Sequence, residues 1–273
     1  MACRAVLTVL FSTTPTLYAL DINPWFNPPF EFHLKPLYEY THDSHLQTSD
    51  GTIAITDYEN WTQLSLQVSP WCYWDLQLSL AGASASSWNY RFAEGACMIR
   101  YNWMDDTVGD RFTLVTGAKL SFVSSRLLSD IDFFDPAPFN TEFGLTAGKA
   151  FYKNHKVDWY SRLWTYLGYG IGNHGHPWFN SYFNWDIRLA KNTTWRWELQ
   201  VRKGFGNEAI TITNPFAGYA NLDYQIVNFG ANLEHAFNNC FTARVFGLYN
   251  LHSKNASENF WIAGVQMQIP FSL

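Results

Sequence analysis

The feature that most constrains this chain is its C-terminal stretch, in which apolar side chains alternate strictly with polar or small ones. The polar or small positions are Gly264, Gln266, Gln268, Pro270 and Ser272. The apolar positions are Trp261, Ala263, Val265, Met267, Ile269, Phe271 and Leu273. A period of two residues predicts a β-strand with one apolar and one polar face. Soluble proteins seldom end on an apolar side chain of such a strand, so the pattern indicates an apolar environment outside the chain.

This stretch resembles the closing strand of bacterial outer-membrane β-barrels. Their assembly signal is a terminal aromatic residue preceded by apolar residues at alternate positions, and the matching residues here are Val265, Met267, Ile269, Phe271 and Leu273. The sequence departs from the pattern because it ends on Leu273, with the aromatic residue two positions earlier. The resemblance implies contact with the barrel-assembly machinery and with the lipid and lipopolysaccharide of the outer membrane.

The composition excludes a helical membrane protein and argues against a nucleic-acid partner. Beyond the N-terminus the sequence has no run of about 18 apolar residues, the length that a spanning helix requires. A search for long apolar runs does not detect a β-barrel, because apolar lipid-facing residues alternate with polar lumen-facing ones. Charged residues make up only 15% of the chain while aromatic residues reach 18%, and the net charge of −5 offers no basic surface for nucleic acid.

The N-terminus predicts a secretory signal peptide over residues 1–19. A single basic residue, Arg4, precedes the apolar run from Ala5 to Phe11, and Ala19 supplies a small residue before cleavage at Leu20. A first buried strand is the alternative. Residues 20–29 are proline-rich and are expected to form a periplasmic lead-in, and residues 30–273 the barrel.

Alternation continues along the chain and predicts twelve antiparallel strands. Long connections are expected at residues 42–59, 82–91, 124–140 and 206–222, and turns at 70–72, 104–110, 152–156 and 191–194. Aromatic residues fall at strand ends, as expected for girdles at two membrane interfaces. They are Trp71, Tyr73, Trp103, Phe151, Trp159, Trp195 and Phe241 at one end, and Phe122, Tyr169, Phe179, Phe205, Tyr249 and Trp261 at the other.

An even strand number allows the sheet to close without an unpaired edge in lipid. The fold class is therefore an all-β, transmembrane, up-and-down antiparallel β-barrel of about twelve strands. The rival is a soluble lipocalin-like barrel or sandwich whose apolar faces point to a core. Such a protein needs a charged exterior, whereas the polar faces here are rich in Asn, Gln, Ser and Gly.

No catalytic, metal or cofactor site is expected from the sequence. Outer-membrane phospholipase, a twelve-stranded enzyme, places His-x-Ser on a strand, but the nearest segment here is N-H-G-H-P at 173–177. It lacks the serine, and no carboxylate is placed to orient His174 or His176. These are interpreted as polar loop residues, with a weak His-x-His metal pair as the alternative. After signal removal Cys72, Cys97 and Cys240 remain, at spacings that match no zinc or redox motif.

Arginines occupy lumen-facing positions on three consecutive predicted strands, residues 157–205. If Ile171 pairs with Phe179 and Leu189 with Trp195, one row holds Arg162, Arg188 and Arg196, the next holds Trp164, Asp186 and Glu198, and Arg202 lies higher. The architecture is similar to that of twelve-stranded channels for acidic oligosaccharides, whose lumens carry arginine tracks. Arginines beside aromatic rings suit an anionic or sugar-like solute, but acid and base rows this close can also form a bracing salt-bridge lattice.

The function expected from these patterns is a narrow, porin-like channel for small polar or anionic solutes. A closed barrel whose loops act in adhesion or interaction is the second interpretation, and an outer-membrane lipid hydrolase is the third. The sequence leaves the solute, the state of the lumen and the oligomeric state open.

Overall fold

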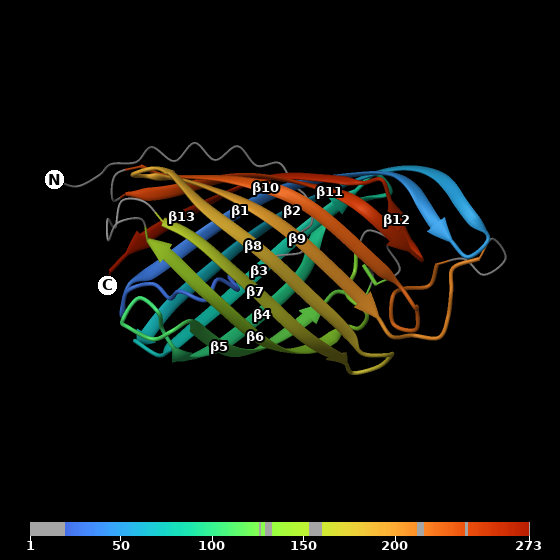
Figure 1. Cartoon of the computed structure of the whole chain (residues 1–273). Helices are drawn as coiled ribbons and strands as arrows, with labels where there is room; N and C mark the ends of the chain where they lie inside the picture. Colours follow the sequence, from blue (N-terminus) through green and yellow to red (C-terminus); the bar gives the residue numbers. More distant parts are fainter. Residues whose placement is uncertain are drawn as a thin grey trace.

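The computed structural model describes residues 20–125, 127–128, 133–152, 160–211, 216–237 and 240–272. Within these residues, thirteen antiparallel strands form one sheet that closes on itself (Figure 1). The strands are β1 (Phe32–Thr48), β2 (Gly51–Trp71), β3 (Trp74–Ala85), β4 (Trp88–Met104), β5 (Thr113–Val123), β6 (Phe139–Tyr152), β7 (Tyr160–Gly172), β8 (Trp178–Ala190), β9 (Thr193–Gly204), β10 (Gln225–Phe237), β11 (Phe241–Lys254), β12 (Ala256–Glu258) and β13 (Trp261–Phe271). Because β12 is a three-residue strand beside β1, the wall consists of twelve long strands. Among the described residues, no helix is long and apolar enough to cross a membrane.

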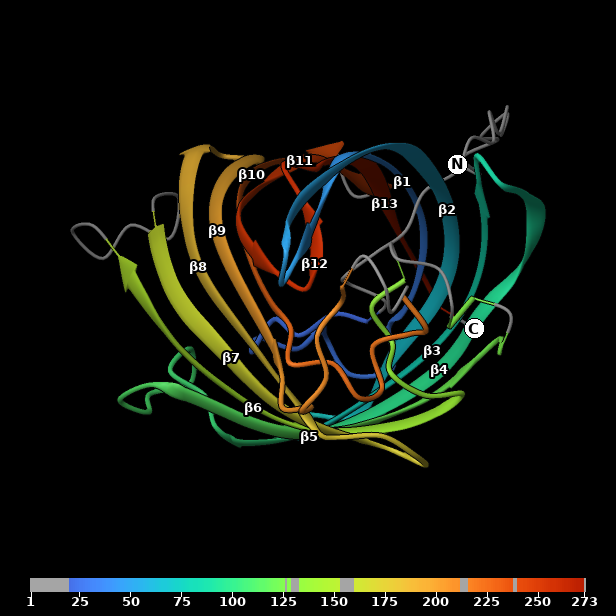
Figure 2. The same ribbon diagram turned by 90° about the vertical axis from the view of Figure 1, so that its right-hand side faces the viewer.

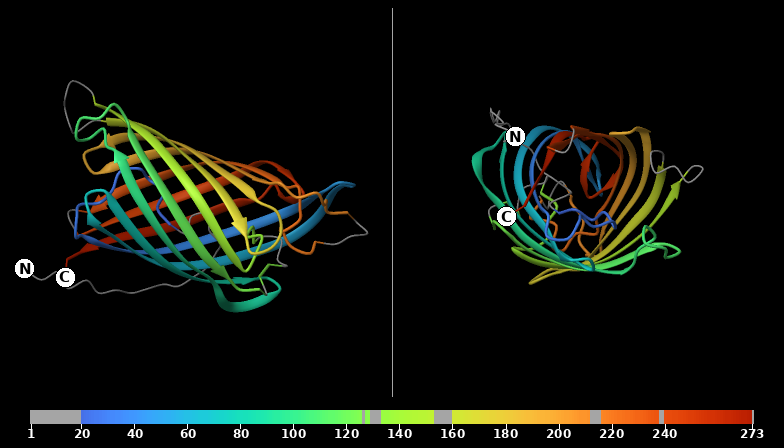
Figure 3. Two further views of the ribbon diagram at one scale, coloured as in Figure 1. Left: turned by 90° about the horizontal axis from the view of Figure 1, so that it is seen from below. Right: turned by 90° about the vertical axis from the view of Figure 1, so that its left-hand side faces the viewer.

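The barrel closes through β1, which pairs with β2 on one side and with β13 on the other. Leu34 lies opposite both Leu66 of β2 and Ile269 of β13, so the ladder continues across the seam. Views along the axis show the resulting ring of strands (Figures 2 and 3). This confirms the predicted closing strand, although Leu273 itself lies outside the described residues.

We call the end that carries Phe32 and Phe271 the periplasmic end, because outer-membrane barrels keep their short turns on that side. The turns at residues 72–73 and 191–192 lie there, whereas the connections at 124–138 and 205–224 lie at the opposite, extracellular end. Outer-membrane barrels place their longer loops outside the cell. The alternation of connections therefore agrees with the predicted orientation.

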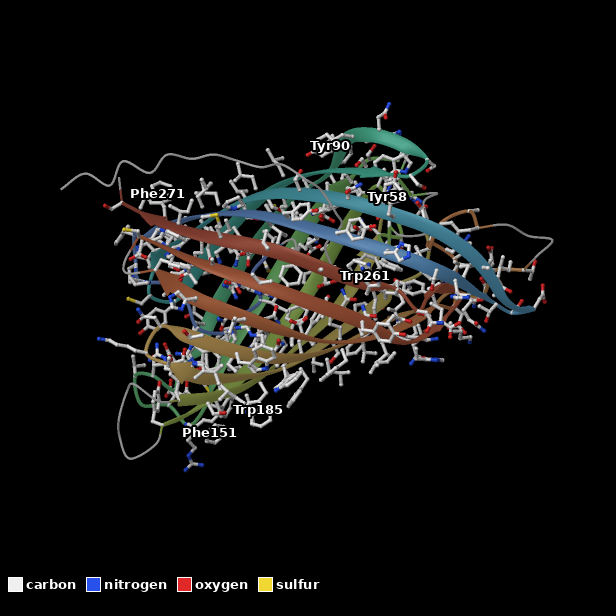
Figure 4. The ribbon with its side chains drawn as sticks, turned by 90° about the horizontal axis from the view of Figure 1, so that it is seen from above. Tyr58, Tyr90, Phe151, Trp185, Trp261 and Phe271 are labelled. Carbon is white, nitrogen blue, oxygen red and sulfur yellow. The ribbon has the colours of Figure 1, made fainter. Side chains whose placement is uncertain are left out.

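The apolar face of each strand points outward, and the polar face points into the lumen. On β3, Leu78 is 58% exposed and Leu80 65%, while their neighbours Gln77 and Ser79 are buried. A soluble barrel would have the opposite arrangement, so the lipocalin-like alternative is wrong. Exposed aromatic rings cluster toward the strand ends (Figure 4), with Phe151, Trp185 and Phe271 toward the periplasmic end and Tyr58, Tyr90 and Trp261 toward the other. Trp159 of the predicted girdle lies outside the described residues.

The outward position of Leu78 leads to a stability prediction. We expect Leu78→Arg to lower the free energy of folding into phospholipid bilayers by about 2–4 kcal/mol, because the guanidinium would face hydrocarbon at mid-membrane. Leu189→Arg, at the periplasmic end of β8 and equally exposed at 61%, is the matched control and should cost about 0–1 kcal/mol. Denaturant titrations of both variants in vesicles would show this difference, and equal costs would contradict the membrane placement.

Two connections predicted as long loops are instead paired strands. Residues 42–59 continue the β1–β2 ladder as far as Thr48 and Gly51, and residues 82–91 continue the β3–β4 ladder as far as Ala85 and Trp88. The polar sequence misled the prediction because a hairpin that rises beyond the membrane can be polar on both faces. In Figure 1 this β1–β2 extension projects past the barrel on the right-hand side.

Candidate functional site: the barrel lumen

The observed register changes the predicted rows of lumen side chains. Tyr169, not Ile171, lies opposite Phe179, and Ile187, not Leu189, lies opposite Trp195. Both pairings are two residues away from the prediction, so each side chain keeps its face but meets a different neighbour. The periplasmic-side row consequently reads Arg162, Asp186, Arg196, and the row above it reads Trp164, Asn184, Glu198.

This alternation of charge produces a buried ion pair. Arg196 donates from Nε to Asp186 Oδ1 at 2.5 Å and from a terminal nitrogen to Oδ2 at 3.1 Å, a bidentate arrangement. The guanidinium also lies 5.2 Å from the ring centre of Trp164, whose Nε1 approaches the same carboxylate at 3.4 Å. Arg196 therefore braces neighbouring strands, as the lattice interpretation requires.

The other predicted lumen residues lie inside the barrel with different partners. Arg162 stacks against Tyr160, with 4.4 Å from guanidinium carbon to ring centre, and Arg188 covers the same ring at 4.5 Å. Arg202 lies nearer the extracellular end, where it donates to the hydroxyl of Tyr224 at 3.3 Å. Glu198 accepts hydrogen bonds from Gln200 and from Asn232, the latter at 3.2 Å.

A second buried ion pair was missed by the sequence analysis. Asp75 is fully buried and accepts two hydrogen bonds from Arg100, at 2.8 and 2.9 Å, together with bonds from Gln67 and Gln77 at 2.7 Å. The two residues lie directly opposite each other in β3 and β4. A regular hairpin centred on residues 86–87 would place Met98 opposite Asp75, and the register shifts between Ala81 and Gly82 and between Ala83 and Ala85 bring Arg100 there instead. Alternation along the sequence does not reveal such shifts.

The N-terminal segment Leu20–Asn27 lies inside the barrel at its periplasmic end, within the ring of strands (Figure 3). Gln77 bonds both backbone groups of Asp21, accepting from its N–H at 2.7 Å and donating to its carbonyl at 2.9 Å. Arg100 donates to the Asn23 carbonyl at 2.6 Å, and Trp25 donates from its indole N–H to Asp106 at 2.9 Å. The predicted lead-in is thus bound to the lumen wall.

An ion pair anchors the start of this segment, with Lys35 Nζ 2.8 Å from Asp21 Oδ2. Burial alone would raise the pKa of the Asp21 carboxyl, but the charges of Lys35 and Arg100 and the hydrogen bond from Lys35 outweigh it and hold that pKa well below its ordinary value. Since the folded-state pKa is lowered, the anchor is complete above the ordinary aspartate pKa of about 3.9 and weakens only as the pH falls below it.

At the extracellular end, loop segments lie within the ring of strands (Figure 2). Ile210, Tyr219 and Leu222 of the connection at 205–224 pack against the inward apolar residues Phe246 and Ile262. On the opposite wall, Leu127 and Phe133 pack against Trp61 and Val123. These apolar contacts narrow the lumen at the extracellular end.

Between these two ends lies a polar cavity of about 290 Å³. Five of the seven predicted lumen residues line it: Arg162, Trp164, Asp186, Arg196 and Glu198. Arg188 and Arg202 are absent from its lining as far as the described residues show. The lining carries equal numbers of basic and acidic side chains. The basic ones are Lys35, Arg162, Arg196 and Arg244, and the acidic ones are Asp21, Asp186, Glu198 and Glu234.

The sequence offered two further candidates for chemistry, the loop histidines and the cysteines. No group of three or more His, Cys, Asp or Glu side chains that could hold a metal occurs within the described part of the chain. No disulfide joins Cys72, Cys97 and Cys240. Cys72 and Cys240 lie in different periplasmic turns, β2–β3 and β10–β11.

Comparison with known proteins identifies the fold. No family model and no curated protein matches the sequence. The structure is similar to that of the COG4313 outer membrane channel from Pseudomonas putida F1, with a TM-score of 0.68 and 10% identity over 93% of this chain and 100% of that one. It is also similar to the NanC porin, with a TM-score of 0.57 and 10% identity over 86% of this chain and 98% of that one. The chain has the fold of a bacterial outer-membrane β-barrel, built here from twelve long strands.

Proposed function

We propose that this protein is a narrow, porin-like channel of the bacterial outer membrane for small polar solutes. The observation that carries the proposal is the polar cavity of about 290 Å³ inside a barrel whose outer face is apolar. Its size lies just below the range of roughly 300–1,000 Å³ found for ligand pockets, which suits a small solute. The two similar structures are described as a channel and a porin, which is consistent with this class.

The balanced charge of the lining favours polar solutes over a strong preference for anions. Four cationic and four acidic side chains surround the cavity, and Arg196 is neutralised by Asp186. A field that attracts anions needs an unbalanced charge of one sign. We therefore propose passage of small polar solutes without strong selection for anions.

Planar-bilayer recordings of the refolded mature chain test the proposal. We expect small, infrequent conductance steps, because the N-terminal segment and the loops both narrow the lumen. Reversal potentials in a salt gradient should show only weak preference between anions and cations. Complete silence, in protein whose folding is confirmed by its resistance to unfolding in detergent, would contradict the channel.

Silence would favour the second candidate, a closed barrel that acts through its extracellular end. The observation that supports it is the apolar cluster that contains Ile210, Tyr219 and Leu222, together with the β1–β2 hairpin that projects beyond the barrel (Figure 1). In either case, we propose that the barrel-assembly machinery recognises β13 and that the outer wall contacts phospholipid and lipopolysaccharide.

A further inference from the structure

The segment Leu20–Asn27 is attached to the barrel differently from every strand of the wall. Within the described part of the chain, it forms no backbone-to-backbone hydrogen bond with a strand. Proline supplies no backbone N–H, so Pro24 and the following Pro28 and Pro29 cannot extend a ladder. The segment depends on side chains of the wall instead, so it can leave without breaking the sheet.

Side chains from four strands and one loop hold the segment. Lys35 of β1 pairs with Asp21, Gln77 of β3 bonds its backbone, and Arg100 of β4 bonds the Asn23 carbonyl. The other contacts come from Thr146 of β6, which donates to the Ile22 carbonyl at 3.3 Å, and from Asp106, which accepts from Trp25. These contacts converge on one short peptide, so they form a binding site for it.

Trp25 joins this segment to the cavity. Its ring centre lies 4.5 Å from the guanidinium carbon of Arg162, which also stacks on Tyr160. Trp25, Phe26 and Asn27 also belong to the cavity lining. The segment thus forms the periplasmic side of the cavity, and its removal would open the cavity toward the periplasm.

The chain reverses direction where the segment meets the barrel wall. Phe30 has φ of 62°, the left-handed region that non-glycine residues rarely adopt, and it is 66% exposed. The strained turn lies just before β1, which begins at Phe32. A residue held in this conformation at the base of a segment bound only by side chains is suited to be a hinge.

We propose that Leu20–Asn27 is a displaceable plug that closes the periplasmic end of the cavity and swings about Phe30. This inference rests on the proposed function where it concerns solute flow, but the displacement itself is independent of conductance. In the closed state the plug occupies the site formed by Lys35, Gln77, Arg100 and Asp106. In the open state that site and Arg162 face the periplasm.

Thiol labelling tests displacement without reference to conductance. In a full-length background with Cys3, Cys72, Cys97 and Cys240 replaced by serine, Ile22→Cys reports on the plug, because Ile22 packs beside Leu20 and Met98 inside the barrel. A water-soluble maleimide should label it slowly. Adding Trp25→Ala removes the bond to Asp106 and the stacking with Arg162, and should speed labelling about tenfold or more. Trp71→Ala, at an exposed tryptophan of the same end, is the matched control and should leave the rate unchanged.

A disulfide lock tests the link to conductance. A Cβ atom on Gly148 would lie 2.9 Å from Pro24 Cγ, so Pro24→Cys with Gly148→Cys places two thiols close enough to bridge. Oxidation should abolish conductance and reduction should restore it, while Trp25→Ala should raise the open fraction.

Equal labelling rates with and without Trp25→Ala would overturn the plug. Unchanged conductance after oxidation of the lock, confirmed by mass spectrometry, would also overturn it. If every variant is silent in bilayers but Trp25→Ala still speeds labelling, the plug stands and the channel function fails.

Discussion

Asp75→Asn should lower the free energy of unfolding by about 3–5 kcal/mol, among the largest effects that we expect from a single substitution in this protein. The neutral amide leaves Arg100 charged, with only 3% of its side chain exposed, inside the barrel. An unpaired buried charge is costly, because no water replaces the lost carboxylate. The free energy would be measured by denaturant titration of the protein folded in phospholipid vesicles.

Asp223→Asn is the matched control. Like Asp75, Asp223 forms an ion pair, in its case with Lys203 and Lys254, but it lies at the extracellular surface. Hydrogen bonds from Lys203 and Lys254 lower the pKa of the Asp223 carboxyl, so its contribution is complete above about pH 3.9 and is lost as the pH falls further. Exposed ion pairs contribute about 0–1 kcal/mol. If the two substitutions cost the same at neutral pH, the burial of the Asp75–Arg100 pair would not matter for stability.

The sequence predicted the wall of this barrel better than its contents. The alternation around Leu78 and Val265 determines which face meets lipid, and a register error of two residues leaves that face unchanged. The same error exchanges ladder neighbours, so Arg188 was predicted beside Arg196 where the structure has Asp186. The alternation of apolar and polar residues could not reveal this register error. Turn geometry sets the register, and the bulge between Arg188 and Ala190 shifts it.

The plug was missed for a different physical reason. Residues 20–29 lack alternation and contain prolines, so the sequence correctly excluded a strand, but no local pattern shows where an irregular peptide docks. Its position depends on Gln77, Arg100 and Asp106, which are distant in the sequence. The aromatic residues Trp25 and Phe26 were the available signal, since a fully exposed lead-in gains nothing from such rings.

Arg196→Glu should also cost about 3–5 kcal/mol, because it would place a third carboxylate beside Asp186 and Glu198 in the lumen. The charge-swapped pair, Asp186→Arg with Arg196→Glu, restores opposite charges across the same two strands. We expect the swap to recover most of the lost free energy, as double-mutant cycles measure.

The same two variants separate bracing from ion selection. If Arg196 braces the barrel, Arg196→Glu should be unstable and leaky in bilayers, whereas the swap should restore both the stability and the low conductance. The swap preserves the net charge of the cavity, so the weak ion preference should also return to that of the unmodified protein. An Arg196→Glu variant that keeps its stability but reverses its ion preference would show that Arg196 selects ions. That result would mean the ion pair with Asp186 contributes nothing to the folded state.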